Sequence, residues 1–488
     1  MNRTPQTLTD AEDLKSFGYV QELLREMGGF SSFAVSFSVI SILTGAIQLY
    51  GYGLQHGGPL QITAGWILVS VFTLTVALAM AELASAYPTA GALYHWSTFL
   101  GSRGFGWATA CFNTIGQFAI LAGIDYGLAQ LLVGVLTLPS SRLLVALIYC
   151  AFLFSHAMLN HRGIRLVSWL NNFSAWYHIG VIVLLIGALS AKGFAQHPAF
   201  LLHFQNSSGY SPKYSFLVGL LLAQWTLTGY DASAHVTEET VDPRRNAPWG
   251  IFLATAISIV AGFLMLVVIT LSIPDLSQAI GFGDNAFTEI LRLRLGYGMG
   301  TAIVLLVLGA MWLCGLAAMT SASRMIYAFA RDGGLPGSKY WAFISKKYRT
   351  PTHAIWGLAG FALALALSVN VYSAVVSVAV IALYISYGLP IAGRLYARYT
   401  RKQTDFTGPW SLGRFSTPVA IIAVIWITFI CVVFVLPPND LAGEVMLTGG
   451  VVLALLWGLL VRRKFAGPPA SALNHLIQLA GKARETVS

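Results

Sequence analysis

Long apolar runs separated by short polar segments make up most of this chain. Most of the runs reach the roughly 20 residues that a helix needs to cross about 30 Å of hydrocarbon. We assign about twelve of them, at residues 33–54, 61–86, 105–136, 142–158, 168–190, 214–236, 249–272, 301–330, 353–370, 374–396, 417–437 and 443–461. The pattern predicts an all-α integral membrane protein with about twelve transmembrane helices.

Small polar residues interrupt the first and the sixth run near the middle. The first run begins near Phe33 and is broken at Ser41, Thr44 and Gly45. At 1.5 Å per helical residue, Thr44 lies roughly 16 Å along that run, which is about mid-membrane. The sixth run is broken at 226–231, which reads Thr-Leu-Thr-Gly-Tyr-Asp. Both interruptions therefore fall where the surroundings are most apolar.

A broken helix frees backbone groups in the membrane, and each costs several kcal/mol when it has no partner. Freed N–H groups attract anions and freed C=O groups attract cations, so a zwitterion can use both. In the first run alone, Gly45, Gly51 and Gly53 could instead allow close helix packing. Matching breaks in two halves are typical of a transporter's binding site, and the coincidence favours that interpretation.

The two broken runs lie five runs apart. Because five is odd, a second set of five helices enters the membrane from the opposite face, which predicts a five-plus-five inverted repeat with broken helices one and six. The predicted organisation is a cytoplasmic N-terminal segment at 1–32, a ten-helix transport core at 33–398, a cytoplasmic linker at 399–416, two accessory transmembrane helices at 417–461 and a cytoplasmic tail at 462–488.

Composition and charge support this class of protein. Hydrophobic residues make up 56% and charged residues 10% of the chain, whereas soluble domains carry about 25% charged residues. Most of the 29 Lys and Arg lie on segments of one side. The positive-inside rule then predicts a multi-pass protein of the plasma or inner membrane with both termini cytoplasmic. This asymmetry explains the net charge without a nucleic-acid partner, and residues 1–30 show no signal-peptide core.

Asp231 is the strongest single candidate for a functional residue. A carboxylate near the centre of a span costs about 2.5–3.5 kcal/mol on insertion scales, so it is expected to be paired or functional. It could contact a substrate ammonium or carry a coupling proton. It could also cap a half-helix that begins at Ala232, because Asp is a favoured N-cap residue. These alternatives are compatible with one another.

Other polar residues at mid-depth have two interpretations each. Asn113 and Gln117 share a helix face and could donate to a substrate or join helices. His178 could carry a coupling proton or be a neutral structural residue. Ser321 could help to bind Na⁺ or bond its own backbone. Asp125 is expected nearer the outer side, in a water-exposed vestibule.

Aromatic and charged residues near the sixth run are candidates for gates. Trp225 and Tyr230 flank its break. Glu238 and the following Glu239 stand at its cytoplasmic end, where salt bridges to arginines are expected. Arg324, at the cytoplasmic end of the eighth run, is expected to snorkel to the membrane surface or to pair with a cytoplasmic-side carboxylate such as Glu82.

Four local motifs resemble those of the amino acid–polyamine–organocation superfamily of permeases, and within it the amino acid/choline transporter family with its GABA and choline permeases. They are SFSVISILTG at 36–45, AELASAYPTAG at 81–91, GYDASAHVTEET at 229–240 and SRMIYAFARDGGLP at 323–336. The resemblance implies the leucine-transporter type of fold, with substrate held between spans one, three, six and eight. Some superfamily members use a Lys in span five for proton coupling, and His178 is the candidate at that depth here.

On this resemblance, the first break takes a substrate carboxylate and the sixth faces the amine or side chain. The predicted binding residues are Ser41, Thr44, Gly45, Ala46, Asn113, Gln117, Thr228, Gly229, Tyr230 and Asp231. The coupling candidates are Asp231, His178 and Ser321, and the gate candidates are Trp225, Tyr230 and Glu238.

These observations predict a secondary active transporter of amino acids or related amines such as GABA, working by alternating access and coupled to protons or running as an exchanger. A choline or polyamine permease of the same fold is the alternative, and a passive channel fits less well because no repeated filter is present. An enzyme is not expected, since HExxH, CxxC, Walker and nucleophile-elbow motifs are missing. The four cysteines form no CxxC pair, so no metal or cofactor is expected. The expected partners are a small amino acid or amine, the lipid bilayer, and H⁺ or Na⁺.

Overall fold

The described part of the chain folds into a bundle of helices. The computed structural model describes residues 9–139, 141–368, 372–400 and 408–469. Ten helical segments there are long and apolar enough to cross a membrane, and the one β-type pairing in these ranges is an isolated bridge between Met27 and Thr240. The all-helical membrane fold is therefore confirmed, while the count of twelve spans and the inverted repeat stay predictions.

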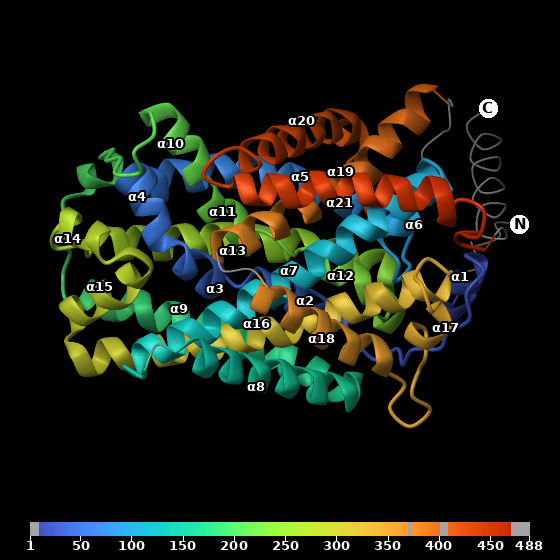
Figure 1. The fold of residues 1–488 in the computed structure, drawn as a ribbon, viewed down its shortest axis with the longest axis horizontal. Coiled ribbons are helices and arrows are strands. Elements are labelled where there is room, and N and C mark those ends of the chain that lie inside the picture. The colour runs from blue at the N-terminus through green and yellow to red at the C-terminus, as the bar shows by residue number, and fades with distance from the viewer. Residues whose placement is uncertain (1–8, 140, 369–371, 401–407, 470–488) are drawn as a thin grey trace, which may run out of the picture.

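The helices run mostly along the longest axis of the molecule (Figure 1). In chain order they begin with α1 (Asp10–Ser16), α2 (Gly29–Ile40), α3 (Ile42–Gln48), α4 (Tyr50–Leu60), α5 (Trp66–Ala86), α6 (Leu93–Leu100), α7 (Arg103–Val135), α8 (Arg142–His161), α9 (Ile164–Ala191), α10 (Pro212–Gly219) and α11 (Leu221–Thr226). They continue with α12 (Ala232–His235), α13 (Pro243–Leu271), α14 (Leu276–Gly281), α15 (Ala286–Leu295), α16 (Tyr297–Arg331), α17 (Ser338–Trp341), α18 (Thr352–Ser368), α19 (Tyr372–Thr400), α20 (Ser416–Phe434) and α21 (Asp440–Leu456).

The first predicted span is broken at Ser41, between α2 and α3. Ser41 has φ 29° and ψ 82°, outside the helical region, and this conformation is uncommon for a residue with a side chain. A second irregularity at Leu49 separates α3 from α4. Beyond α4, Gly58 with φ 62° and one π-helical turn at Gln61–Gly65 lead directly into α5. The first two predicted spans are therefore joined by helix rather than by a loop.

The sixth predicted span is broken between α11 and α12. The backbone leaves the helix at Leu227 and passes through Gly229, whose φ is 98°. A Cβ at Gly229 would lie 2.4 Å from Cγ1 of Val39 on α2. Glycine is needed here both for its left-handed backbone and for the close approach to the first broken span.

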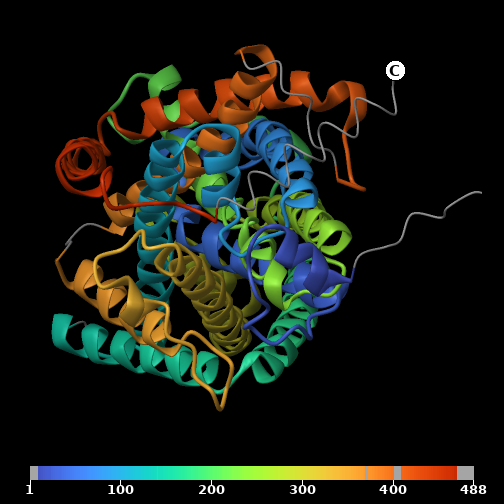
Figure 2. The same cartoon turned by 90° about the vertical axis from the view of Figure 1, so that its right-hand side faces the viewer.

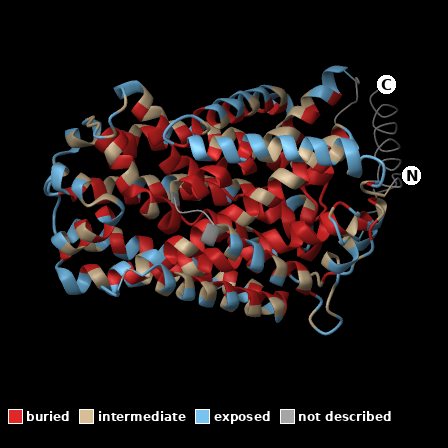
Figure 3. Ribbon diagram, viewed as in Figure 1, coloured by how far each residue is buried: buried red, intermediate tan, exposed pale blue. Residues whose placement is uncertain are grey.

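Burial separates an inner set of helices from a peripheral one. Of the most apolar stretch of α2–α3, 89% is buried, whereas only 6% of that of α21 is. Figure 3 shows this contrast, with α21 and the outer face of α20 exposed and the centre of the bundle buried. The two broken spans thus lie in the protein interior, where their irregular backbone is shielded from lipid.

The two ends of the bundle differ, and we name them by their helices. The α1 end carries α1, α6 and α17, and the α14 end carries α10, α14 and α15 (Figure 1). Figure 2 faces the α1 end. In the predicted orientation, the α1 end is cytoplasmic. Parts of the predicted terminal segments and linker, at 1–8, 401–407 and 470–488, lie outside the described residues.

Candidate substrate site and its gates

The break in the first span is held by a chain of buried hydroxyls and one imidazole. Nδ1 of His178 donates to the carbonyl of Ser174 at 2.8 Å, so its Nε2 accepts from the hydroxyl of Ser41 at 2.8 Å. The hydroxyls of Ser41 and Thr44 lie 2.6 Å apart. Both nitrogens of a neutral His178 are thereby used. Three of the predicted site residues meet here, and the imidazole fixes the conformation of the break.

A small cavity lies where the two broken spans meet. Its volume is about 10 Å³, roughly what one water molecule requires. The lining residues are Val39, Ile40, Thr44, Gly45, Ile120, Ile124, Trp225, Thr228 and Cys314. Gly45 permits the close packing beside it, because a Cβ there would lie 2.5 Å from Cα of Thr226. The cavity in this closed state is too small for an amino acid.

Asp231 lies in a separate polar cluster. Its carboxylate accepts from the hydroxyl of Tyr387 at 2.7 Å and from Nε2 of Gln117 at 3.3 Å. Nε2 of His235 lies 3.2 Å from the same carboxylate. Asp231 stands at the N-cap position of α12, which begins at Ala232 as expected, but its side chain makes no hydrogen bond to the first turn. Asp231 faces α7 and α19 and does not line the small cavity.

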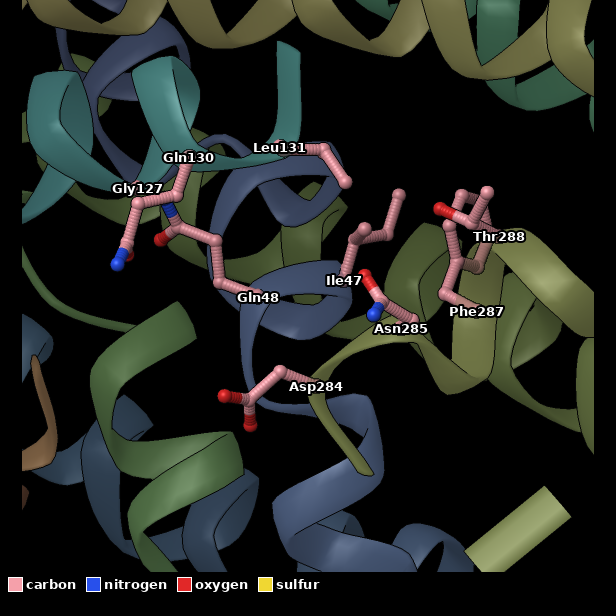
Figure 4. A pocket seen from close by; sticks show the side chains of 9 residues that line it. All are labelled: Ile47, Gln48, Gly127, Gln130, Leu131, Asp284, Asn285, Phe287 and Thr288. Carbon is pink, nitrogen blue, oxygen red and sulfur yellow. The ribbon is translucent and has the colours of Figure 1, made fainter. Parts of the chain in front are cut away.

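A larger pocket of about 230 Å³ lies toward the α14 end (Figure 4). It is lined by Ile47, Gln48, Gly127, Gln130, Leu131, Asp284, Asn285, Phe287 and Thr288. The amide of Gln48 accepts from Nε1 of Trp225 at 3.2 Å and donates to the carbonyl of Ile124 at 3.4 Å. Because Gln48 lines this pocket while Trp225 and Ile124 line the small cavity, the hydrogen-bonded pair Gln48–Trp225 separates the two spaces.

Buried ion pairs close the α1 end. Glu238 pairs with Arg331 at 2.9 Å, and the fully buried Glu239 pairs with Arg324 at 2.9 Å. The expected salt bridges of both glutamates are therefore present. The expected pairing of Arg324 with Glu82 is wrong, because Glu82 is bound by Arg394 of α19. The depth of Glu82 along its run suggested it as the partner of Arg324. The 3₁₀ turn after α12 instead places Glu239 against Arg324.

The N-terminal segment packs over these pairs. The hydroxyl of Tyr19 donates to Asp332 at 2.8 Å, and His95 lies 2.9 Å from the same carboxylate. Arg25 donates to the carbonyls of Thr237 and Thr240 at the end of the sixth span. Burial opposes ionisation of Asp332, but its interactions with His95, Arg331 and Tyr19 together hold the pKa of Asp332 below its ordinary value. The α1 end is thus closed by contacts from four parts of the chain.

Comparison with known proteins agrees with this architecture. The family described as "Amino acid permease" matches residues 27–457. The chain is 38% identical to the protein named amino-acid permease BAT1 homolog of Oryza sativa subsp. japonica, over 93% of this chain and 94% of that one. It is 38% identical to amino-acid permease BAT1 of Arabidopsis thaliana, over 94% and 96%. It is 27% identical to a GABA-specific permease of Saccharomyces cerevisiae, over 96% and 87%.

The chain belongs to the amino acid permease family. It is a multi-pass membrane transporter of that family and not an enzyme. The structure distributes the predicted site residues over two clusters. Thr44, Gly45, Thr228 and Trp225 line the small cavity, with Ser41 bonded to Thr44. Gln117 and Asp231 instead meet beside α19. Gly229 belongs to the break of the sixth span, whereas Ala46 lies within helix α3, beyond the break at Ser41.

The predicted site residues still to be placed are Asn113, Tyr230 and Ser321. Asn113 donates to the hydroxyl of Ser386 at 3.1 Å, and the hydroxyl of Tyr230 reaches that of Tyr384 at 3.5 Å. Ser321 is buried, and its Oγ has no hydrogen-bond partner among the described residues. In this family member, α19 contributes more to the central polar cluster than the sequence interpretation allowed.

Tyr387 is the functional candidate that sequence reasoning missed. It lies on α19, in the tenth predicted span, and holds the Asp231 carboxylate. The spacing of Tyr384 and Tyr387 places both on one helix face. Two tyrosine hydroxyls on one face of an apolar run were the sequence signal that could have identified Tyr387. Asp125 was misplaced as well, because it is fully buried beside His156 and does not face a vestibule.

Proposed function

We propose that this permease is a secondary active transporter that moves an amino acid or a related amine across the plasma membrane by alternating access. One arrangement carries the proposal. Two interrupted helices meet at a central cavity that is sealed by buried ion pairs toward the α1 end and by one hydrogen-bonded pair toward a pocket at the α14 end. A carrier needs a barrier on each side of one site, opened in turn.

The gating follows from these contacts. Rotation of Trp225 away from Gln48 would merge the small cavity with the pocket of about 230 Å³, which approaches the size of small-molecule sites. Opening toward the α1 end requires Glu238 and Glu239 to leave their arginines. In the predicted orientation, the described conformation is closed and lies nearer to outward opening, with both termini and the linker cytoplasmic.

The substrate is proposed to bridge the two broken spans. Backbone and hydroxyl groups from Ser41 to Ala46 would receive its carboxylate, while Thr228 to Asp231 would face its amine or side chain. A relative is named a GABA-specific permease, which supports GABA as a test substrate. Choline or a polyamine is the alternative, because such a cation would use Asp231 without needing the first break.

The direct test uses purified protein reconstituted in liposomes. A thermal-shift screen against amino acids, amines and choline selects the substrate, and counterflow of that radiolabelled compound then tests the mechanism. We expect a saturable transient accumulation of label, since only a carrier with alternating access shows counterflow. Substrate-dependent flux without counterflow would indicate a channel and refute the proposal. A thermal shift with choline and none with any amino acid would favour the alternative substrate class.

A further inference from the structure

Asp125 of α7 and His156 of α8 form a buried pair inside the bundle. Nδ1 of His156 lies 3.0 Å from Oδ2 of Asp125, and both side chains are fully buried. The other polar atom of each, Oδ1 of Asp125 and Nε2 of His156, has no hydrogen-bond partner among the described residues. Two unpartnered polar atoms on adjacent titratable groups are costly in the interior, which suggests a role beyond stability.

The pair lies directly behind the wall of the central cavity. Ile124 and Cys314 line the cavity, and their next neighbours in the chain are Asp125 and Gly315. A Cβ on Gly315 would lie 2.1 Å from Oδ1 of Asp125 and 2.6 Å from Cε1 of His156. The backbone of α16 at Gly315 therefore lies directly against the pair. A movement of the cavity wall on either α7 or α16 changes the surroundings of the pair.

The first broken span is tied to the same place. Sγ of Cys314 donates to the carbonyl of Val39 on α2 at 3.3 Å, two residues before the break. The titratable groups that face the pair are Tyr149 of α8 and Cys314 of α16, and the ring of Trp312 packs on His156 with centroids 5.1 Å apart. Among the described residues, neither member of the pair has a second ion-pair partner. The net charge of the pair therefore depends on one carboxylic acid, Asp125, and one imidazole, His156.

Polar contacts lead from the pair to the ion pairs of the α1 end. Asn160, one turn beyond His156, donates to the carbonyl of His156 at 3.1 Å. Its Oδ1 accepts from the hydroxyl of Thr320 at 2.9 Å and from Arg324 at 3.4 Å. Arg324 pairs in turn with Glu239. The pair is thus connected both to the substrate cavity and to the gate that seals the opposite side.

We propose that Asp125 and His156 together bind the proton that is coupled to transport, an inference that rests on the proposed function. With one proton bound, the pair has no net charge. Without it, the pair carries one buried negative charge, which is expensive inside a membrane protein. The dry, closed conformation is therefore reached in the protonated form. Opening of the cavity wall admits water, stabilises the carboxylate and releases the proton.

A metal cation is a poorer occupant of this place. Hard cations such as Mg²⁺ take about six oxygen ligands, whereas the pair offers the two oxygens of Asp125. Among the described residues, no group of three or more His, Cys, Asp or Glu side chains could hold a metal ion. An imidazole and a carboxylate can each bind and release a proton, so the chemistry of the pair suits H⁺.

The test separates proton coupling from substrate exchange. Liposomes containing pyranine and the wild-type protein, the double variant Asp125→Asn/His156→Gln or the single variant His156→Gln are assayed with the compound selected by the thermal-shift screen. The two amides can keep a hydrogen bond while losing the titration. We expect the wild type to show substrate-dependent proton influx and accumulation driven by a pH gradient. Both are expected to fall at least tenfold in the variants, while counterflow stays within about threefold.

The opposite results would overturn the inference that the pair binds the coupled proton. A wild type with counterflow but no proton influx overturns the inference, and so does a variant that keeps gradient-driven accumulation. Variants whose unfolding temperature is normal but whose binding and counterflow are lost also overturn it, because the pair is then structural. His353→Gln on α18 is the control and should behave as wild type. A wild type without binding or counterflow would refute the proposed function itself, independently of the pair.

Discussion

The guanidinium of Arg331 lies over the ring of Tyr19, with Cζ 3.9 Å from the ring centroid. The same guanidinium binds Glu238 at the end of the sixth span. The N-terminal segment therefore contacts the charge that seals the α1 end, and it is a structural part of that seal.

Replacing Tyr19 by Ala should loosen the α1 end. The change removes a cation–π contact worth about 0.5–2 kcal/mol and a hydrogen bond to a carboxylate worth about 1.5–3 kcal/mol. We expect hydrogen exchange at residues 237–240 to rise about tenfold or more. Tyr297→Ala is the matched control, because Arg292 lies over that ring at the α14 end. Equal exchange in wild type and Tyr19→Ala would show that the segment does not hold the seal.

The pair Arg324–Glu239 should respond as a fully buried ion pair. Arg324→Met alone leaves a buried carboxylate without its partner, and such losses cost about 3–5 kcal/mol. We expect a lower unfolding temperature, with much of the loss regained in the double variant Arg324→Met/Glu239→Met. Thermal unfolding of the purified proteins measures both. Additive losses in the double variant would mean that the two residues act independently.

Asp231→Asn should abolish or uncouple uptake in a protein that still reaches the membrane. The amide cannot accept the bonds of Tyr387, Gln117 and His235 as a carboxylate does, and each such charged bond is worth about 1.5–3 kcal/mol. We expect uptake to fall at least tenfold or to lose its pH dependence, measured beside Glu444→Gln on the exposed face of α21. Normal pH-dependent uptake by Asp231→Asn would remove this residue from the mechanism.

Gly45→Leu should block substrate binding. Even a Cβ at this position would lie 2.5 Å from the backbone of Thr226, so a larger side chain must push α11 away from α3 and fill the cavity. Affinity in the thermal-shift assay is expected to drop at least tenfold. Gly180→Leu on α9 introduces the same side chain where nothing lies within 4 Å and should bind normally. Undiminished affinity in Gly45→Leu would count against the site.

Acid should weaken the seal through Asp332. Its pKa is lower in the folded protein than its ordinary value, so the unfolded chain binds more protons as the pH falls through that range. The stabilisation is complete above the ordinary pKa of about 3.9 and is lost below it. Unfolding temperatures between pH 6 and 3 should therefore fall less steeply in Asp332→Asn than in wild type. Parallel curves would contradict this origin of acid sensitivity.

The sequence predicted the positions of the helix breaks well. Ser41 and the stretch around Gly229 interrupt apolar runs with small polar residues, and the structure leaves the helical conformation at both. The signal was local, because a break depends on the residues at that point. The salt bridges of Glu238 and Glu239 to arginines were also predictable, since buried carboxylates at the end of a span need partners.

The identity of the partners could not be predicted in the same way. Position along a run fixes the depth of a side chain, but the rotation of each helix decides which neighbour it meets. Asp231 was expected to face a substrate or to cap a half-helix, and its carboxylate instead meets Tyr387. Arg324 was expected beside Glu82 and meets Glu239. Asp125 was placed near the outer surface, although His156 lies against it within the interior.

The contact between Gly229 and Val39 has a wider consequence. Because the backbone at Gly229 packs directly against the side chain of Val39, neither interrupted segment can rearrange while the other keeps its shape. A molecule that enters and spreads one of them must displace both. Cargo recognition and the reorientation of the carrier would then be a single event, and an imperfect substrate that engages only one segment would bind without being carried across.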